Sequence, residues 1–298
     1  MENQIKNINS DFLRQCVEIA FLRNNQPESN CAYCPKEERA IHDEINYLMN
    51  SPDNLMLGYF DSDSLVSVFG FFFNPDTSWV DCIGPFFKDD WDQEVAKEMF
   101  NHAVSSFTQA VRFNFYFDTK NENLHKLAES LSAKRNDNEY ILLLRKADYK
   151  PQDIKHTVVM FEDKYRAEFI RIFNDTFSDT YIPPESAIDA IGKDREIFCV
   201  LDERSAFVGY GILKRYTNSS HATAEIFGVD EKSRGKGYGW AVLNTVLDCA
   251  LNKYDADTVD LIVDKLNTHA RELYYSCGFK LTVENAAYCL KNRANVPL

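Results

Sequence analysis

The feature that most constrains this chain is the stretch Arg234-Gly235-Lys236-Gly237-Tyr238-Gly239. It follows a short apolar run at residues 224–229 that predicts a strand, and it precedes apolar residues at 240–251 that recur at helical spacing. Three glycines at alternate positions let the backbone approach an anion closely, because no Cβ stands in the way. The loop amides and the positive end of the following helix then face the same point. The stretch predicts a phosphate-binding loop; a glycine-rich strand–helix turn without a ligand is the alternative.

A second motif comes after a strand-like run at residues 258–263 and reads Asn267-Thr268-His269-Ala270-Arg271-Glu272-Leu273-Tyr274-Tyr275-Ser276-Cys277-Gly278-Phe279. Together the two motifs resemble those of the GCN5-related N-acetyltransferase (GNAT) family. The first is similar to the family's Arg-x-x-Gly-x-Gly acetyl-CoA loop, and the second to its Asn-x-x-Ala-x-x-Leu-Tyr-x-x-x-Gly-Phe motif. The resemblance covers roughly residues 155–292.

This resemblance implies an α/β fold in which helices flank a mixed sheet. It also implies an acetyl-CoA-dependent N-acetyltransferase that transfers the acetyl group directly to a primary amine of a small molecule or a peptide. A catalytically silent CoA-binding regulatory or scaffolding module is the alternative. Acetyl-CoA is the only co-substrate that the resemblance implies, and the residues themselves do not identify the acceptor.

The resemblance also assigns the cofactor-binding residues. Phe227, Gly228 and Val229 would bind the pantetheine arm, and the Val229 amide would polarise the thioester oxygen. Gly228 would allow a bulge at this point of the strand. The loop residues Arg234 to Gly239, with Lys232 nearby, would hold the pyrophosphate and the 3′-phosphate. Asn267 would cap the last helix and bind the pantetheine arm.

Two residues match catalytic positions of the family. Glu225 lies where several members have a general base, and strand alternation would put it on one face with Phe227 and Val229. Tyr274 matches the tyrosine that protonates the departing thiolate. The alternatives are a carboxylate at a strand edge for Glu225 and a core aromatic residue for Tyr274.

Length and element order predict two domains. The 298 residues exceed one such domain, and a proline-containing polar stretch after residues 140–144 suggests a boundary that divides the chain into 1–150 and 151–298. The first half repeats the predicted element order of the second, so we expect two tandem GNAT folds. Where the second half has its glycine loop, the first has the acidic residues 88–94. We therefore expect a degenerate first domain without cofactor, an arrangement similar to tandem acetyltransferases of the mycothiol synthase kind.

Composition excludes several classes of partner. The net charge of −13 argues against nucleic acid and against anionic membranes, because both are bound by excess Lys and Arg. No apolar run approaches the length of a membrane span, and residues 1–10 lack a signal-peptide core. Eight scattered cysteines without a secretion signal predict a reduced, cytoplasmic setting. The oligomeric state stays open.

Two weaker constellations remain. Cys31 and Cys34 form a lone CxxC pair, and without two further ligands we expect no metal site. Asp175, Asp179 and Tyr181 lie where the family's first two helices cover the acceptor site. They would receive a cationic or polyhydroxylated amine, or they would simply form a polar loop.

Overall fold

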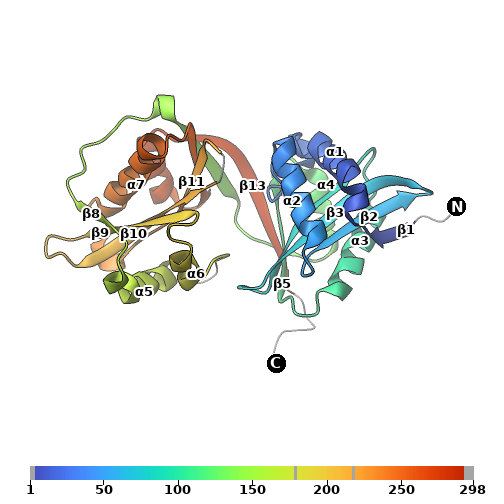
Figure 1. The fold of residues 1–298 in the computed structure, drawn as a ribbon, viewed down its shortest axis with the longest axis horizontal. Helices are drawn as coiled ribbons and strands as arrows, with labels where there is room; N and C mark the ends of the chain where they lie inside the picture. The colour runs from blue at the N-terminus through green and yellow to red at the C-terminus, as the bar shows by residue number, and fades with distance from the viewer. Residues whose placement is uncertain (1–3, 178–179, 217–218, 292–298) are drawn as a thin grey trace. The chain divides into compact units, whose positions relative to one another are not determined.

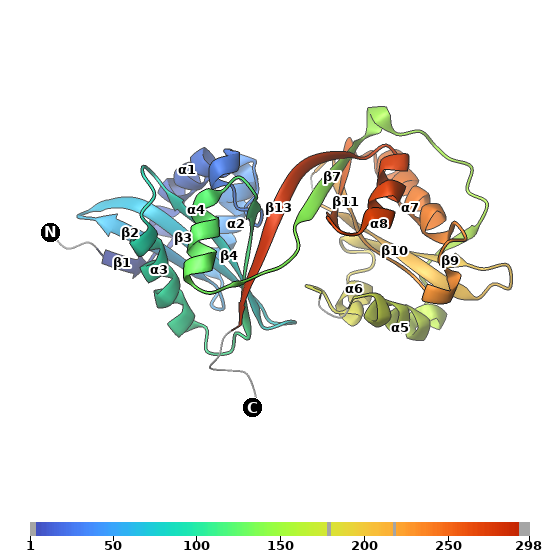
Figure 2. The same cartoon turned by 180° about the vertical axis from the view of Figure 1, so that it is seen from behind.

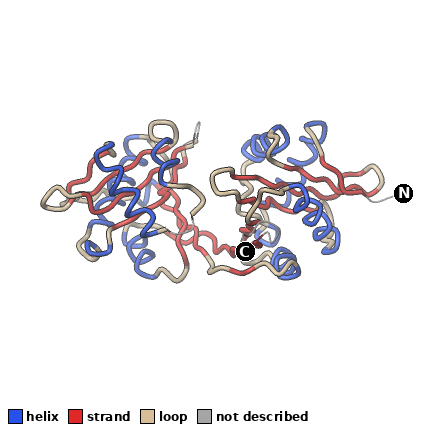
Figure 3. The backbone as a smooth tube through the Cα atoms, turned by 90° about the horizontal axis from the view of Figure 1, so that it is seen from below, coloured by secondary structure: helices blue, strands red, loops and turns tan. Residues whose placement is uncertain are grey.

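The structure is a computed structural model that describes residues 4–177, 180–216 and 219–291. It contains two compact units. Unit 1 comprises the described residues up to Glu139 together with those from Glu284 onward, and unit 2 comprises Tyr140–Val283. In each unit helices cover both faces of a mixed sheet, so the predicted α/β fold class is confirmed (Figure 3).

Unit 1 is built around a sheet with the strand order β1-β2-β3-β4-β5, in which β4 and β5 are parallel. The end of β13 continues this sheet as an antiparallel neighbour of β5. The strands are β1 (Gln4–Asn7), β2 (Leu55–Asp61), β3 (Ser64–Asn74), β4 (Trp79–Phe87), β5 (Arg112–Asp118), β6 (Lys134–Arg135) and β13 (Lys280–Lys291). The helices are α1 (Leu13–Asn24), α2 (Glu38–Asn50), α3 (Gln93–Ser106) and α4 (Glu122–Ser130).

Two apolar layers hold unit 1 together. Helices α1 and α2 pack on one face of the sheet, and α3 and α4 pack on the other (Figure 1). The second layer is rich in aromatic rings, because β3 and β5 point phenylalanines such as Phe71 and Phe113 at Phe100 of α3. Burial of such large side chains is the main source of stability here.

Unit 2 has the strand order β8-β9-β10-β11-β12-β7, with the start of β13 beyond β7. Strands β10 and β11 are antiparallel, whereas β11 and β12 are parallel and pair only over residues 221–223 and 258–260. The strands are β7 (Glu139–Arg145), β8 (Thr157–Met160), β9 (Arg195–Leu201), β10 (Phe207–Arg215), β11 (His221–Val229) and β12 (Thr258–Asp264). The helices are α5 (Arg166–Thr176), α6 (Pro184–Asp189), α7 (Tyr238–Asp248) and α8 (Thr268–Ser276).

The two faces of the unit 2 sheet have separate cores. Helix α7 packs on one face, near α8, and α5 and α6 pack on the other (Figures 1 and 2). Beyond residue 223 the strands β11 and β12 no longer pair. A gap between the two parallel strands is therefore left beside the second half of β11.

The division of the chain differs from the predicted one at 150/151, and the difference comes from two exchanged strands. Strand β7 ends the first half of the sequence but lies beside β12 in unit 2. The last part of β13 pairs with β5 of unit 1, for example Ala287 with Tyr116. The start of β13 lies beside β7, where the Thr282 hydroxyl donates to the Ile141 carbonyl at 2.9 Å. The order of the elements along the chain does not predict which sheet either strand joins.

Candidate active site

A cavity of about 830 Å³ in unit 2 brings both sequence motifs together. We call it the glycine-loop cavity. Its walls are the end of β11, the glycine loop, the first turn of α7 and one side of α8. The lining residues are Thr176, Phe227, Val229, Ser233, Arg234, Gly235, Gly237, Tyr238, Gly239, Trp240, Leu243, Asn267, His269, Ala270, Glu272, Leu273, Tyr274 and Ser276.

Two glycines of the loop have a backbone conformation that side chains disfavour. Gly235 has φ +74° and Gly237 has φ +86°, both in the left-handed region. A Cβ on Gly237 would come within 3.2 Å of the His156 Nε2 atom, whereas a Cβ on Gly235 would meet open space. His156 is hydrogen bonded to the Lys236 carbonyl at 3.0 Å, so the loop is held against this ring. Gly235 and Gly237 thus contribute only backbone to the wall of the cavity.

The first turn of α7 supplies free donors. Gly237 is the N-cap and has no side-chain cap, and the first backbone bond into the helix runs from the Ala241 amide to the Gly237 carbonyl. The amides of Tyr238, Gly239 and Trp240 precede it and have no partner within the helix. All three residues line the cavity, where these amides and the helix dipole favour an anion.

Helix α8 provides the opposite wall. Asn267 caps it, because its side-chain oxygen accepts from the Ala270 amide at 3.1 Å. Tyr274 lies in the same helix and lines the cavity. Burial, with a smaller contribution from Cys277, raises the pKa of Tyr274 to about 12. Its phenol therefore keeps its proton at neutral pH.

Strand β11 directs backbone groups into the gap beside β12. The Asp230 amide donates to the Val208 carbonyl of β10, and hydrogen bonding alternates along an antiparallel pair. The amides of Phe227 and Val229 consequently point away from β10, toward the unpaired side of β11. The Val229 carbonyl accepts from Arg234 Nε at 3.1 Å, which ties the loop to the strand.

The expected bulge of β11 lies at a different residue. The pairing with β10 passes from Ile226 opposite Ile212 to Ala224 opposite Leu213, so Glu225 is the extra residue. Gly228 pairs regularly with β10. A Cβ at this position would lie 2.6 Å from the Tyr210 ring, so the lack of a Cβ makes room for that ring. A bulge changes which residues share a face.

The expectation that Glu225 shares a face with Phe227 and Val229 is therefore wrong. Phe227 and Val229 pack with the α7 core, while the neighbouring Ile226 packs with the α5–α6 core. Glu225 is on this second side, where it accepts a hydrogen bond from Tyr181 of the loop between α5 and α6. It is not among the residues that line the glycine-loop cavity.

Glu225 has two hydrogen-bonding partners among the described residues, Arg195 and Tyr181, and the Lys214 ammonium lies 4.0 Å from its Oε1. Arg195 Nε donates to Oε2 at 2.7 Å and Arg195 Nη2 donates to Oε1 at 2.8 Å, which makes a two-pronged ion pair. The Tyr181 hydroxyl donates to Oε1 at 2.5 Å. The Glu225 side chain is only 2% exposed. The sequence did not indicate Arg195, because a single arginine at the start of an apolar strand belongs to no motif.

Most of the predicted cofactor residues line the cavity together, but two of them do not. Gly228 lies beneath Tyr210, and Lys236 contributes only its carbonyl, to His156. The lining residues Trp240 and Leu243 were not predicted, since apolar helix residues give no signal beyond a core pattern, and Thr176 at the end of α5 belongs to no motif. Asp175 binds Arg171 at 3.0 Å, and Asp179 lies outside the described residues.

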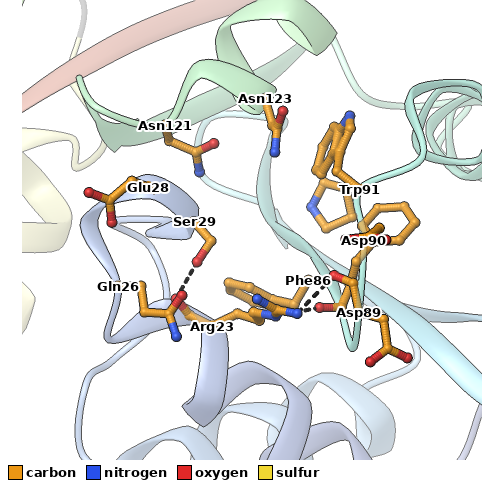
Figure 4. A pocket seen from close by; sticks show the side chains of 12 residues that line it. Arg23, Gln26, Glu28, Ser29, Phe86, Asp89, Asp90, Trp91, Asn121 and Asn123 are labelled. Carbon is orange, nitrogen blue, oxygen red and sulfur yellow. Dashed lines mark hydrogen bonds between the residues drawn. The ribbon is translucent and has the colours of Figure 1, made fainter.

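The corresponding pocket in unit 1 is smaller than the glycine-loop cavity. The pocket there measures about 250 Å³, and the Arg23 side chain extends across it (Figure 4). Arg23 donates to the carbonyls of Phe87, Lys88 and Asp89 at 2.7, 2.6 and 2.8 Å. Asp92 caps α3, because its side chain accepts from the amides of Glu94 and Val95. The equivalent amides in the first turn of α7 are free. An anion finds carbonyls and carboxylates here instead of amides.

The two cysteines of the CxxC pair lie in the core of unit 1. Cys31 and Cys34 are buried thiols, and burial raises the pKa of Cys31 to about 11. Over residues 4–177, 180–216 and 219–291, no three His, Cys, Asp or Glu side chains gather in an arrangement suited to a metal ion. No helix in the same ranges is long and apolar enough to cross a membrane.

Comparison with known proteins agrees with this geometry. Residues 159–279 match the profile of the acetyltransferase (GNAT) family. No curated protein sequence matches the chain. Among solved structures, a tandem GNAT protein from the clavulanic acid biosynthesis pathway has 11% identity and a TM-score of 0.69, covering 99% of this chain and 100% of its own. A GCN5-related N-acetyltransferase from Sphaerobacter thermophilus has 12% identity and a TM-score of 0.77, with 99% and 98% covered.

Proposed function

We infer that this chain is an acetyltransferase, because residues 159–279 match the model of the GNAT acetyltransferase family and the whole chain is similar in fold to a tandem GNAT protein. We propose that it transfers the acetyl group of acetyl-CoA directly to a primary amine of a small molecule or a peptide. The observation that supports this most is the glycine-loop cavity, in which the unpaired α7 amides, the Val229 amide and the Tyr274 phenol converge.

The cavity fits the parts of coenzyme A by their chemistry. The left-handed backbone of Gly235 and Gly237 shapes the loop beside the first turn of α7, and the α7 amides with Arg234 would hold the pyrophosphate there. The edge of β11 at Phe227 and Val229, together with Asn267, would bind the pantetheine arm. When bound, acetyl-CoA supplies an activated thioester carbonyl.

Tyr274 would act as the general acid in this proposal. A phenol with a pKa of about 12 holds its proton at neutral pH and can donate it to a thiolate that leaves. The Val229 amide would polarise the thioester oxygen. Glu225 stays the predicted base, because it is a carboxylate on the α5–α6 side of β11, next to the gap between β11 and β12.

Unit 1 would serve as a scaffold without cofactor. Its pocket is smaller, and the carbonyls of its loop bind Arg23, whereas the loop of unit 2 leads into free α7 amides. We therefore expect one molecule of coenzyme A per chain. Isothermal titration of the full chain measures this number directly, and two equivalent sites would contradict the scaffold role.

A transfer assay on the full chain tests the function as a whole. Release of free thiol from acetyl-CoA is followed across a panel of primary amines, with each product checked by mass spectrometry. Transfer to an amine supports the proposal. Binding of coenzyme A without transfer to any amine would favour the alternative, a silent CoA-binding regulatory or scaffolding module. No binding at all would contradict both.

A further inference from the structure

The ion pair between Arg195 and Glu225 is almost completely buried. The side chains are only 10% and 2% exposed, so each has given up most of its contact with water. A buried carboxylate is stable only when its oxygens are satisfied. Here Arg195 satisfies both oxygens of Glu225, and the remaining guanidinium nitrogen, Nη1, donates to Asp194 Oδ2 at 3.0 Å. The orientation of the Glu225 carboxylate is thereby fixed by the fork of the guanidinium.

Arg195 is itself held by the backbone around it. Its amide donates to the Ala190 carbonyl at 3.3 Å, and its carbonyl accepts from the Gly192 amide at 3.0 Å. It lies opposite Lys214 in the pairing of β9 with β10. A lysine could supply the charge at this position but not the planar, two-pronged donor set.

Glu225 connects Arg195 to an exposed residue, Tyr181. Its Oε1 accepts from the hydroxyl of Tyr181, whose residue is 47% exposed and lies in the loop between α5 and α6. Thr176, at the end of α5, lines the glycine-loop cavity. Arg195, Glu225 and Tyr181 thus form a chain of contacts from the buried start of β9 to an exposed ring near the end of α5.

The position of this chain relative to the cavity follows from β11. Pairing between β11 and β12 ends at Thr223 and Asp260, two residues before Glu225. Phe227, two residues after Glu225, lines the cavity from the α7 side, while Glu225 lies on the α5–α6 side. A group that passes from the cavity through the gap beside β11 therefore arrives next to Glu225 and Tyr181.

We propose that Arg195 is a positioning residue for the acceptor side of the site: it holds the Glu225 carboxylate in the one orientation that receives the Tyr181 hydroxyl, and so it sets how the acceptor amine is bound. Arg195 touches neither the acceptor nor coenzyme A and acts only through Glu225. The inference rests on the proposed acetyltransferase function and adds to it a residue that no motif contains.

The experiment compares four variants of the full chain with a fifth variant as a control. Arg195→Met removes the charge and the fork, and Arg195→Lys keeps the charge alone. Glu225→Gln and the double variant Arg195→Met/Glu225→Gln test whether the two residues act together. Arg215→Met is the matched control, because Arg215 is a β10 arginine that pairs with Glu196 at 3.7 Å and packs on Tyr254, away from Glu225.

For each variant, kcat/KM is measured for the acceptor amine found with the wild-type chain, affinity for coenzyme A by calorimetry, and folding by thermal unfolding. We expect Arg195→Met to lower kcat/KM for the acceptor by about tenfold or more while the affinity for coenzyme A changes by less than about twofold. Arg195→Lys should recover only part of the loss. The double variant should lose no more than the worse single variant, because both act at one place.

Three results would overturn the inference. Arg195→Met could keep kcat/KM for the acceptor within about twofold of the wild type, its losses could add to those of Glu225→Gln, or its affinity for coenzyme A could fall in parallel with turnover. If Arg195→Met does not fold, Arg195→Lys decides by the same criteria. A wild-type chain that transfers to no amine would refute the proposed function itself, and the inference with it.

Discussion

Gly237→Glu is the substitution that tests the phosphate loop most directly. Gly237 has φ +86°, and a side chain in this left-handed conformation costs about 1–2 kcal/mol. Its Cβ would lie 3.2 Å from His156 Nε2, so the ring has to move and its hydrogen bond to the Lys236 carbonyl, worth about 0.5–1.5 kcal/mol, is weakened. We expect the free energy of unfolding to fall by about 2 kcal/mol. This corresponds to a drop in Tm of about 4–8 °C.

The effect on coenzyme A binding should be larger than the effect on folding. The new carboxylate would stand at the N-terminus of α7, beside the place proposed for the pyrophosphate. Two unit charges about 5 Å apart at an effective dielectric constant of about 20 repel each other by about 3 kcal/mol. Affinity for coenzyme A should therefore fall by about a hundredfold or more. Calorimetric titration measures the affinity, and circular dichroism during heating measures the Tm.

Gly192→Glu is the matched control for this experiment. Gly192 also has a left-handed backbone, φ +78°, and a Cβ there meets no atom within 4 Å. The substitution adds the same charge and the same left-handed backbone strain, without the contact to His156, and Gly192 does not line the glycine-loop cavity. The reasoning is refuted if Gly237→Glu keeps its affinity for coenzyme A within about threefold of wild type. It is also refuted if both variants lose affinity equally, because the cause would then be strain and not the phosphate site.

Three further predictions follow from the same site. Tyr274→Phe keeps the packed ring but removes the proton donor, so kcat should fall by about 10²–10⁴ with little change in coenzyme A affinity; unchanged turnover would remove the acid role. Because burial holds the pKa of Tyr274 at about 12, its proton stays bound as pH rises from 7 to about 10, and turnover should show no loss from this group in that window. A falling limb that vanishes in Tyr274→Phe would contradict this. Gly228→Ala should lower the free energy of unfolding by about 1–3 kcal/mol, since its Cβ would lie 2.6 Å from the buried Tyr210 ring; chemical denaturation measures the loss, and an unchanged midpoint would show that the ring moves freely.

Much of the site could be predicted because its signals are local. The glycine loop, the Asn267 cap and Tyr274 each depend on a few neighbouring residues in one turn or one helix. The strand predicted at residues 258–263 is β12 (Thr258–Asp264) in the structure, because apolar residues recur in it at strand spacing. The tandem fold was likewise visible, since the same element order recurs in both halves.

The features that could not be predicted from the sequence depend on how distant strands pair. The bulge at Glu225 exists only relative to β10, and it moves the carboxylate to the other face of the sheet. Arg195 lies on β9 and Glu225 on β11, with β10 between them, so no sequence spacing connects the two residues. The exchange of β7 and β13 is also non-local, because an apolar strand carries no mark of the sheet it will join. Patterns of burial identify strands well and identify their neighbours poorly.

The exchanged strands have a consequence for synthesis on the ribosome. Strand β5 of unit 1 pairs on one edge with residues 285–291, which are synthesised only after all of unit 2. Until then its outer edge presents unpaired backbone groups, which is the kind of edge that recruits strands from other chains. Domains otherwise tend to fold in the order in which they emerge. In this protein the half that is made first is the last to be finished, and its nascent form is the state that most needs protection from aggregation.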